Sequence, residues 1–428
     1  MPFCHCQRHF GTEAALIQHQ AAKHRSPLVA SQPGPSQPNH APAQQSAPSP
    51  RLPTSTRISY ESRMLLKGVL SQEMIHTIDA AALQPSTTPV SSSTPPELIC
   101  SYNWQGSGGF HVPGHAPVWQ NLALPITIPN DRTNRPGNKP IWTTPKDQFY
   151  QVFQATALMR PEFRFNDVDV VTTRNTLRKF LDFCHGRTQD AFRVHVSLVR
   201  DTLFIEQYHV RPMTRQSTGW GHNFEKAFTE FPPGLQGSTS HDRFLRYPIG
   251  ELNCVVGFEV DACYEDSASR KRDAQSELEA PQDGLKEFSL SNMDSKDLVP
   301  EGKIMPQSTA AELKSTSKPG KTSISNYLPQ LWFGRTSWLI VGSHNEGTFV
   351  ETKVTNVDQR LKQWEMGRQE DLRKLVTLLA EIRGALRGRG GQRFAVVYEK
   401  HGTSRILKMY KVVDQNVVGE SVVGQFWV

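Results

Sequence analysis

Carboxylates recur in three short segments of the chain. Glu225 falls in the first turn of an expected helix after a glycine-rich break, and Glu259 and Asp261 end an expected strand on one face. Glu312 and Lys314 repeat the same i, i+2 spacing further on. Carboxylate oxygens are the ligands that Mg²⁺ and Mn²⁺ prefer, and a lysine can offset charge that develops on a phosphate. Together these residues predict the metal site of a phosphodiesterase.

An arginine precedes the carboxylates in the sequence. Arg174 lies where an expected strand at 168–171 runs into an expected helix at 176–183, and a guanidinium at such a junction can hold a phosphate. Each motif is weak alone, because a Glu-Val-Asp sequence ends a strand more often than it binds a metal. Their occurrence together, in this order, makes the interpretation more specific.

Residues 1–25 contain a separate set of metal ligands. Cys4, Cys6, His19 and His24 are spaced in a way that resembles a Cys₂His₂ zinc finger, a small ββα unit that folds around structural Zn²⁺. One residue separates the two cysteines, whereas the usual knuckle has about two to four, and this departure leaves His5 or His9 as alternative ligands. We predict a zinc-bound finger that docks on protein or RNA.

Apolar periodicity predicts a mixed α/β domain around the carboxylates. Strands are expected at 168–171, 193–198, 202–205, 254–260, 338–342, 348–354, 394–398 and 406–412. Helices are expected at 176–183, 223–231 and 357–386. These elements place Glu225 on a helix and Glu259 and Asp261 at a strand end.

Two other segments are expected to be largely disordered. Residues 26–96 form a Pro/Ser/Gln-rich linker with short helices at 60–66 and 71–83, and residues 265–310 form a polar insertion. Such segments have too little apolar surface to offset the entropy lost on ordering.

Composition excludes two classes of protein. The 428 residues include six cysteines, too few for a disulfide framework, and no apolar run approaches the ~20 residues of a membrane helix. We therefore expect a cytosolic or nuclear protein rather than a secreted or membrane one, and the net charge of +7 favours the nucleus. The basic tract at 353–411 suits a polyanion, although a solvated helix face explains it equally well.

The ordered motifs resemble the DXO family of RNA 5′-end decapping and deNADding exonucleases, in what looks like a divergent fungal branch. The resemblance spans about residues 97–412. It implies a domain at 97–428 with twisted mixed β-sheets, flanking helices and a PD-(D/E)xK-nuclease-like core. It also implies Mg²⁺ or Mn²⁺ bound by Glu225, Glu259, Asp261 and Glu312, assistance by Lys314, and RNA phosphate contacts from Arg174.

The same resemblance assigns a second RNA contact to Arg335 and leaves three points open. Asn175 replaces the family's glycine, and the family's glutamine after Glu-Leu-Lys aligns with Gly334 or Arg335. A competing Glu-x-Lys occurs at Glu351 and Lys353, on a more regular strand. We prefer Glu312 and Lys314 because the segments after them keep the family's order.

The resemblance implies hydrolysis of triphosphate, unmethylated or NAD-capped RNA 5′ ends, and for some members binding to a nuclear 5′→3′ exoribonuclease. One alternative is an inactive RNA- or exonuclease-binding protein on the same fold. Another is a zinc-finger DNA-binding regulator, although Ala15 offers no hydrogen bond at a position that would face bases.

Overall fold

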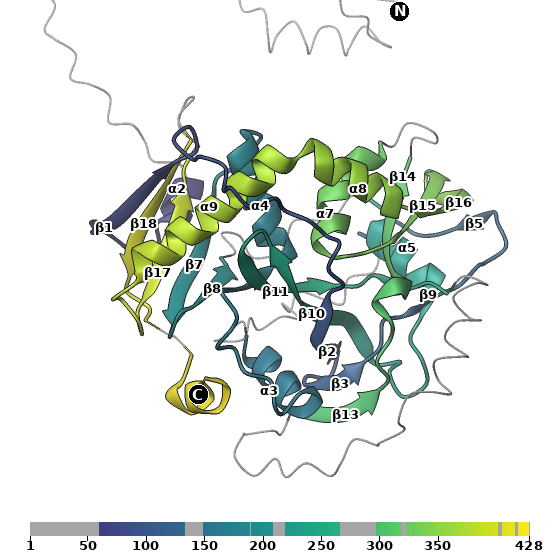
Figure 1. Ribbon diagram of the computed structural model, residues 1–428. Helices are drawn as coiled ribbons and strands as arrows, with labels where there is room; N and C mark the ends of the chain where they lie inside the picture. Colours follow the sequence, from purple (N-terminus) through teal and green to yellow (C-terminus); the bar gives the residue numbers. More distant parts are fainter. Residues whose placement is uncertain are drawn as a thin grey trace, which may run out of the picture. The chain divides into compact units, whose positions relative to one another are not determined.

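The computed structural model describes residues 60–132, 149–188, 190–208, 219–265, 297–317, 323–400, 405–415 and 418–427. The expected finger, with its ligands Cys4, Cys6, His19 and His24, lies outside these residues, as does the expected linker up to residue 59. The described residues form two β-sheets with helices packed against them (Figure 1). This arrangement confirms the predicted mixed α/β class.

The larger sheet has eleven strands among the described residues, in the order β1-β18-β17-β7-β8-β6-β11-β10-β2-β3-β13. The bounds are β1 Val69–Asp79, β2 Glu97–Gln105, β3 Phe110–Gly114, β6 Val170–Thr173, β7 Phe192–Val199, β8 Thr202–Gln207, β10 Ser238–Ile249, β11 Leu252–Glu259, β13 Leu298–Gly302, β17 Arg393–Tyr398 and β18 Ile406–Val412. β6 pairs in parallel with β11, with Thr173 opposite Gly257. The carboxyl ends of β6 and β11 therefore lie side by side, where Arg174 follows β6 and Glu259 ends β11.

The smaller sheet has seven strands among the described residues, in the order β5-β16-β15-β14-β12-β4-β9. The bounds are β4 Val118–Trp119, β5 Ile126–Thr127, β9 Thr229–Glu230, β12 Ala262–Cys263, β14 Ala310–Thr316, β15 Trp338–Asn345 and β16 Thr348–Asn356. β12 follows β11 after two residues and pairs with β14, with Ala262 opposite Ala311. Thus the end of the larger sheet runs directly into the smaller one beside Glu312.

Helices cover both sheets. They are α2 Tyr60–Leu65, α3 Tyr150–Met159, α4 Arg174–His185, α5 Gly221–Phe228, α7 Leu328–Phe333, α8 Asp358–Gly367, α9 Gln369–Leu386 and α10 Glu420–Phe426, with 3₁₀ turns at Gln307–Thr309 and Ile324–Asn326. α4 packs against α7 and α9, and α5 packs against β14. The single helix expected at 357–386 is broken at Arg368, directly after Gly367.

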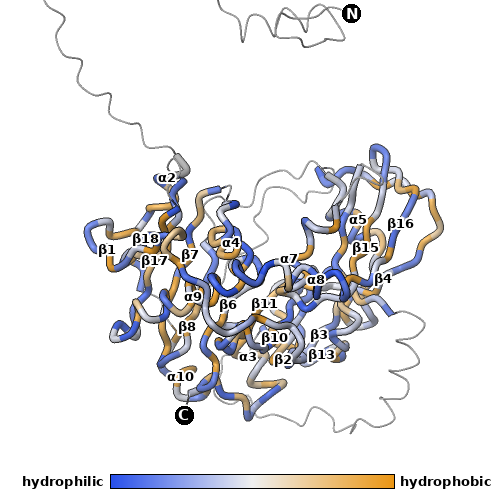
Figure 2. The backbone as a smooth tube through the Cα atoms, turned by 45° about the horizontal axis from the view of Figure 1, so that its top comes forward, coloured by the Kyte–Doolittle hydropathy of each residue, from blue (hydrophilic) through white to orange (hydrophobic). Residues whose placement is uncertain are grey.

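Apolar side chains form several buried clusters against the two sheets. One lies between the larger sheet and α4, α7 and α9, another lies under α3 and α10, and a third joins α5 to the smaller sheet through Phe224, Phe228 and Phe349. Figure 2 shows hydrophobic stretches recurring along the strands and hydrophilic ones in the connections. Among the described residues, no helix has the length and apolar character of a membrane span.

Two segments that we expected to be disordered or helical are strands. Val69–Asp79 is strand β1, paired with β18, instead of part of a helix at 71–83 within a linker. Gln, Glu and Met favour a helix locally, but pairing along β18 and burial of Ile78 override that preference. Leu298–Gly302 is strand β13, paired in parallel with β3, so the disorder expected across 265–310 is wrong for its last part.

Candidate active site

The two sheets meet at a group of acidic and basic side chains. Asp261 follows β11, and its Oδ2 accepts a hydrogen bond of 2.9 Å from the backbone N–H of Leu313 on β14. Because Leu313 stands between Glu312 and Lys314, this bond places the Glu-x-Asp segment directly against the Glu-x-Lys segment. The positions of the two motifs in the sequence do not show that they lie next to each other in space.

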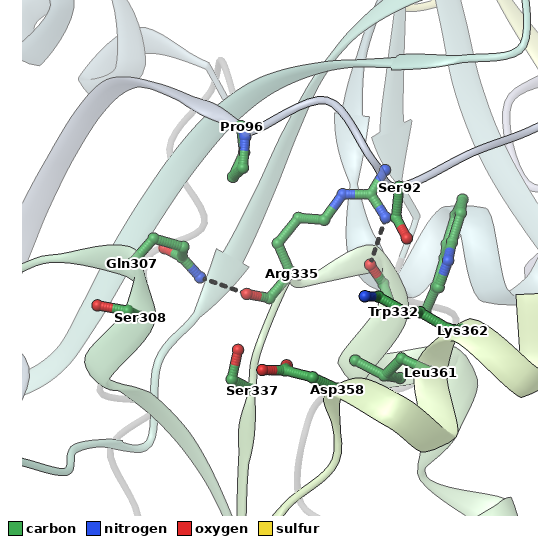
Figure 3. A pocket seen from close by; sticks show the side chains of 10 residues that line it. All are labelled: Ser92, Pro96, Gln307, Ser308, Trp332, Arg335, Ser337, Asp358, Leu361 and Lys362. Carbon is green, nitrogen blue, oxygen red and sulfur yellow. Dashed lines mark hydrogen bonds between the residues drawn. The ribbon is translucent and has the colours of Figure 1, made fainter. Parts of the chain in front are cut away.

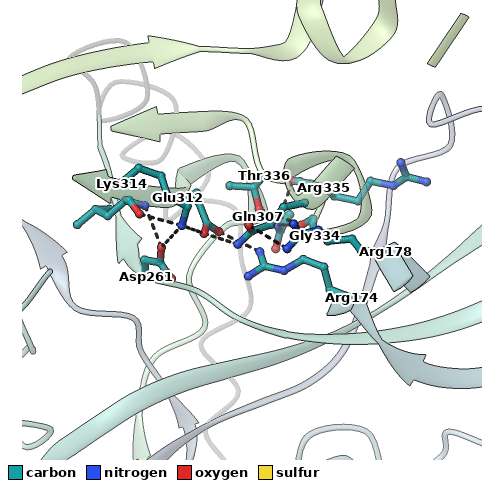
Figure 4. Close-up of polar contacts among 11 residues, drawn as sticks. Arg174, Arg178, Asp261, Gln307, Glu312, Lys314, Gly334, Arg335 and Thr336 are labelled. Carbon is teal, nitrogen blue, oxygen red and sulfur yellow. Dashed lines mark hydrogen bonds and ion pairs between the residues drawn. The ribbon is translucent and has the colours of Figure 1, made fainter. Parts of the chain in front are cut away.

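Glu312 lies at the centre of this group (Figure 4). Its Oε2 accepts a hydrogen bond of 3.0 Å from Arg174 Nη1, and its Oε1 accepts hydrogen bonds from Lys314 Nζ and Gln330 Nε2. The Glu312 side chain is 2% exposed and that of Arg174 is 7% exposed. Both carboxylate oxygens are therefore held by protein donors in a nearly dry setting.

Local structure fixes the position of Arg174. The residue begins α4, and Thr173 caps the helix by accepting a hydrogen bond from the backbone N–H of Thr176. The guanidinium lies 5.3 Å from the centre of the Phe258 ring, and its buried Nε has no hydrogen-bond partner. The Arg174 side chain thus points toward the carboxylates, and its Nε–H donor makes no hydrogen bond.

Glu225 reaches the group from α5. The preceding residue, Phe224, is fully buried and stacks on Phe349 of β16 with ring centres 4.7 Å apart. A Cβ at Gly342 would lie 2.5 Å from the Phe224 ring, so only glycine fits on β15 at this point. Close packing of Phe224 therefore holds the start of α5, and with it Glu225, against the smaller sheet.

Three carboxyl groups resist ionisation. Burial, followed by repulsion from Asp261, raises the pKa of Glu225 to about 8. Burial, followed by repulsion from Glu312, likewise raises the pKa of Asp261 to about 8. Burial, followed by repulsion from Asp242, shifts the pKa of Glu259 upward as well. Solvent still reaches the Glu259 side chain and moderates this repulsion.

Glu312 and Lys314 are stabilised in their charged forms. Burial opposes the charge on Glu312, but Arg174 and Lys314 lower its pKa below the ordinary value. Burial also opposes the charge on Lys314, but Glu312 and Asp261 raise its pKa. The site thus has a buried, ionised end at Glu312 and a crowded acidic end at Glu225, Asp261 and Glu259.

Two residues that we did not single out from the sequence belong to this group. Gln330 on α7 donates to Glu312 and accepts a hydrogen bond from Arg178 at 3.3 Å. The alignment of the family's glutamine with Gly334 or Arg335 therefore missed a glutamine that lies four residues before Gly334 and contacts the site. The sequence feature that could have identified Gln330 is its place in the Leu-Pro-Gln-Leu-Trp-Phe segment.

Asp242 is the second addition. It stands directly opposite Glu259 in the antiparallel pairing of β10 and β11, so the two side chains share one face of the sheet. Burial raises the pKa of Asp242 to about 6, while a hydrogen bond with Trp104 and the charge of Arg174 oppose that shift. Strand register, which the sequence did not reveal, brings this carboxylate to the site.

The competing Glu-x-Lys pair lies elsewhere. Glu351 and Lys353 have exposed side chains on β16, which is separated from β14 by β15. By contrast, Glu312 and Lys314 contact Arg174 and Asp261 directly. The structure groups the pair that we preferred with the Glu-x-Asp carboxylates.

Arg335 extends away from the carboxylates (Figure 4). Its guanidinium lies 4.1 Å from the ring centre of Tyr247 and 4.3 Å from that of Trp332. Arg335 lines a cavity of about 340 Å³. Figure 3 shows the lining residues, which are Ser92, Pro96, Gln307, Ser308, Trp332, Arg335, Ser337, Asp358, Leu361 and Lys362. None of the candidate carboxylates lines this cavity. Arg335 therefore lies in different surroundings from Arg174, which contacts Glu312.

The donor chemistry of the acidic group suits a hard divalent ion. Glu225, Glu259, Asp261 and Glu312 supply carboxylate oxygens, and a cation would relieve the repulsion that raises three of their pKa values. In the present arrangement, no three acidic, histidine or cysteine side chains among the described residues converge closely enough to enclose an ion. In this arrangement both oxygens of Glu312 accept hydrogen bonds from other side chains.

Solved structures of Rai1 proteins share this fold. The crystal structure of S. pombe Rai1 is 12% identical with a TM-score of 0.54, over 79% of this chain and 99% of that chain. Candida albicans Rai1 in complex with pU5-Mn²⁺ is 13% identical with a TM-score of 0.51, over 81% and 94% of the two chains. Scheffersomyces stipitis Rai1 in complex with (3′-NADP)⁺ and calcium ion is 13% identical with a TM-score of 0.50, over 81% and 93%.

At these identities the likeness shows the fold alone. A comparison with curated proteins finds no match. A family described as "Domain of unknown function (DUF8563)" matches residues 72–427, and the chain belongs to that family.

Proposed function

We propose that this protein is a metal-dependent hydrolase of RNA 5′ ends. The observation that carries the proposal is the contact of Asp261 with the backbone of Leu313, which joins the acidic ends of both sheets beside Arg174 and Lys314. Acidic side chains next to two cations suit a reaction in which phosphate must be held and its developing charge stabilised.

Each residue has a role in this proposal. Glu225, Glu259, Asp261 and Glu312 would hold Mg²⁺ or Mn²⁺, which supplies positive charge opposite the reacting phosphate. Arg174 would bind a phosphate oxygen, and Lys314 would hold Glu312 and offset charge on the leaving oxygen. In the reaction, water adds to phosphorus, the bond from phosphorus to the leaving oxygen breaks, and a proton of the water passes to solvent.

The fold supports the choice of RNA 5′ ends over other phosphate esters. Candida albicans Rai1 was solved with pU5-Mn²⁺, and Scheffersomyces stipitis Rai1 with a dinucleotide and calcium ion. We extend these ligand classes to this chain, together with the proposals that the protein acts in the nucleus, carries a zinc-bound finger and binds a 5′→3′ exoribonuclease.

A non-catalytic RNA-binding protein is the second candidate. It is favoured by Glu312, whose two oxygens are occupied by Arg174, Lys314 and Gln330. A carboxylate locked in this way would keep the shape of the site and leave the metal incompletely held.

One experiment separates the two candidates. Purified full-length protein is incubated with RNAs of one sequence that carry a 5′-triphosphate, an unmethylated cap or an NAD cap, with Mn²⁺, Mg²⁺ or EDTA. We expect release of the end group, detected by mass spectrometry, from at least one RNA with metal and from none with EDTA. Binding of RNA without any metal-dependent product would reject the hydrolase and favour the binding protein.

A further inference from the structure

In the described part of the chain, three side chains donate hydrogen bonds to Glu312, and they differ in which other protein partners they would keep if those bonds were broken. Lys314 also donates to the carbonyl oxygen of Leu313 at 2.9 Å and lies 3.8 Å from Asp261. Gln330 also accepts a hydrogen bond from Arg178. Both would keep a protein partner after losing Glu312.

Arg174 has no such alternative in the hydrogen bonds of the described residues. Its hydrogen bond and ion pair are both made with Glu312, and its buried Nε lacks a partner. The ring of Phe258, 5.3 Å away, offers only a weak cation–π contact. A buried guanidinium that loses its hydrogen-bonded carboxylate is destabilised, and a new hydrogen-bonded anion would restore that loss.

A divalent ion at Glu312 would bind at Oε2, because Oε1 already accepts two hydrogen bonds whereas Oε2 accepts one, from the guanidinium of Arg174. The positive charge of Arg174 at that oxygen opposes a second cation. Arg174 is the donor for which a substrate supplies the replacement, since a phosphate oxygen offers the same charge-assisted hydrogen bond as a carboxylate. We propose that Arg174 exchanges Glu312 for an RNA phosphate, so that in the absence of RNA it competes with the divalent ion for Glu312. This inference rests on the proposed function. It adds that Arg174 binds Glu312 before RNA arrives and an RNA phosphate afterwards.

An alternative is that the Arg174–Glu312 pair is purely structural and ties α4 to β14. Removal of Arg174 would then lower the stability of the fold and weaken, or leave unchanged, the binding of metal. The exchange predicts instead that removal of Arg174 raises the affinity for metal, because the metal no longer competes with Arg174 for Glu312. The sign of the change in metal affinity therefore distinguishes the two.

Arg178 supplies a matched control. It lies one turn further along α4, and its charge also acts on Glu312, but its hydrogen bond is made to Gln330. Arg174→Gln and Arg178→Gln remove the same charge from the same helix, so a difference between them reports the direct contact with Glu312. Arg174→Lys keeps the charge and one donor, and it serves if Arg174→Gln does not fold.

Binding is measured on the full chain without RNA, with free Mn²⁺ detected by electron paramagnetic resonance and thermal midpoints as the folding check. We expect Arg174→Gln to bind Mn²⁺ about tenfold more tightly than the wild type, the change expected for loss of one charge-assisted hydrogen bond. We expect Arg178→Gln to stay within about twofold, and Arg174→Lys to lie between the wild type and Arg174→Gln. In Ca²⁺, Arg174→Gln should bind a 5′-phosphorylated U5 oligonucleotide about tenfold more weakly than the wild type.

Unchanged or weaker Mn²⁺ binding by Arg174→Gln, in a folded protein, would overturn the exchange and leave the hydrolase proposal intact. Tighter Mn²⁺ binding without hydrolysis of any RNA would support the exchange and reject the hydrolase. Failure of both wild type and Arg174→Gln to bind Mn²⁺ at these carboxylates would reject both.

Discussion

Asp261 accepts a hydrogen bond of 2.9 Å from the backbone N–H of Leu313. The side chain of Asp261 is 12% exposed, and Lys314 lies 3.8 Å from the same oxygen. One carboxylate therefore both fastens the larger sheet to the smaller one and faces the cation beside Glu312. These two roles can be separated by substitution.

Asp261→Asn keeps an oxygen for the Leu313 N–H, and the amide cannot ionise. Because repulsion from Glu312 contributes to the raised pKa of Asp261, we expect this variant to be at least as stable as the wild type in urea unfolding. We expect its metal-dependent rate to fall by about a thousandfold, since an amide is a poor ligand for Mn²⁺. Asp261→Ala should be about 1–3 kcal/mol less stable than Asp261→Asn, because the buried N–H loses its acceptor. Equal stability of the two variants would contradict the structural role of the bond.

Gln330 connects Arg178 to Glu312. Gln330→Ala removes a hydrogen bond to a charged group, worth about 1.5–3 kcal/mol, and we expect the rate of RNA hydrolysis to fall about ten- to a hundredfold. Gln307→Ala is the control, because within the described part of the chain Gln307 donates to the backbone carbonyls of Gly334 and Arg335 and to no carboxylate. A rate for Gln330→Ala within twofold of that for Gln307→Ala would exclude Gln330 from the site.

Phe224, the residue before Glu225, packs against Gly342, where there is no room for a side chain. In Gly342→Ala the added methyl would meet the rings of Phe224 and Phe349 at 2.5 and 2.8 Å. We expect a loss of about 1–3 kcal/mol from overpacking, with a lower hydrolysis rate because Phe224 precedes Glu225.

Gly384→Ala is the matched control for that substitution. Gly384 lies in α9 with open space around its Cβ direction, and alanine should stabilise the helix by about 0.5–1 kcal/mol. Chemical denaturation of both variants checks the pair. A Gly342→Ala protein as stable as the wild type would show that Phe224 does not hold α5 in the way described.

His195 makes the stability of the fold dependent on pH. Burial, followed by the charges of Arg393 and Arg193, lowers its pKa to about 2, against about 6.5 in the unfolded chain. Its Nε2 accepts hydrogen bonds from Arg193 at 3.0 and 2.7 Å, so it stays neutral when folded. Stability from this group is complete above pH ~6.5 and is lost as the pH falls, because only the unfolded chain binds the proton.

We expect this group to remove about 2 kcal/mol of stability at pH ~5 relative to neutral pH. His195→Gln keeps an acceptor for Arg193 and does not titrate. Urea unfolding of both proteins at the two pH values isolates the effect. A parallel loss of stability in the wild type and in His195→Gln would contradict the assignment.

Much of the fold around the site was predictable because its elements carry strong local patterns. The apolar strand ending at Glu259, the helix beginning near Arg174 and the hairpin of β15 and β16 all occur within a few residues of their expected bounds. β1 was missed because its residues favour a helix until β18 pairs with them. β13 was missed because it is short, half polar and paired with a distant strand.

The candidate site was predictable in its members and not in its contacts. Glu-x-Asp and Glu-x-Lys are visible as motifs, but the hydrogen bond that joins them depends on the pairing of β12 with β14. Asp242 reaches the site only through its register with Glu259. Gln330 depends on the packing of α7, and periodicity gives no information on which side chain of a helix reaches a carboxylate on a neighbouring strand.

The rate of a Glu259→Ala/Asp261→Ala double variant tests the central claim most directly. Wild type and variant are compared with Mn²⁺ on the RNA 5′ end that reacts fastest, after urea unfolding has shown that both are folded. We expect end-group release by the wild type and a fall of at least about a thousandfold in the variant, because the acidic end of the site loses two oxygen ligands. Equal rates would show that the hydrolysis arises elsewhere and would contradict the account.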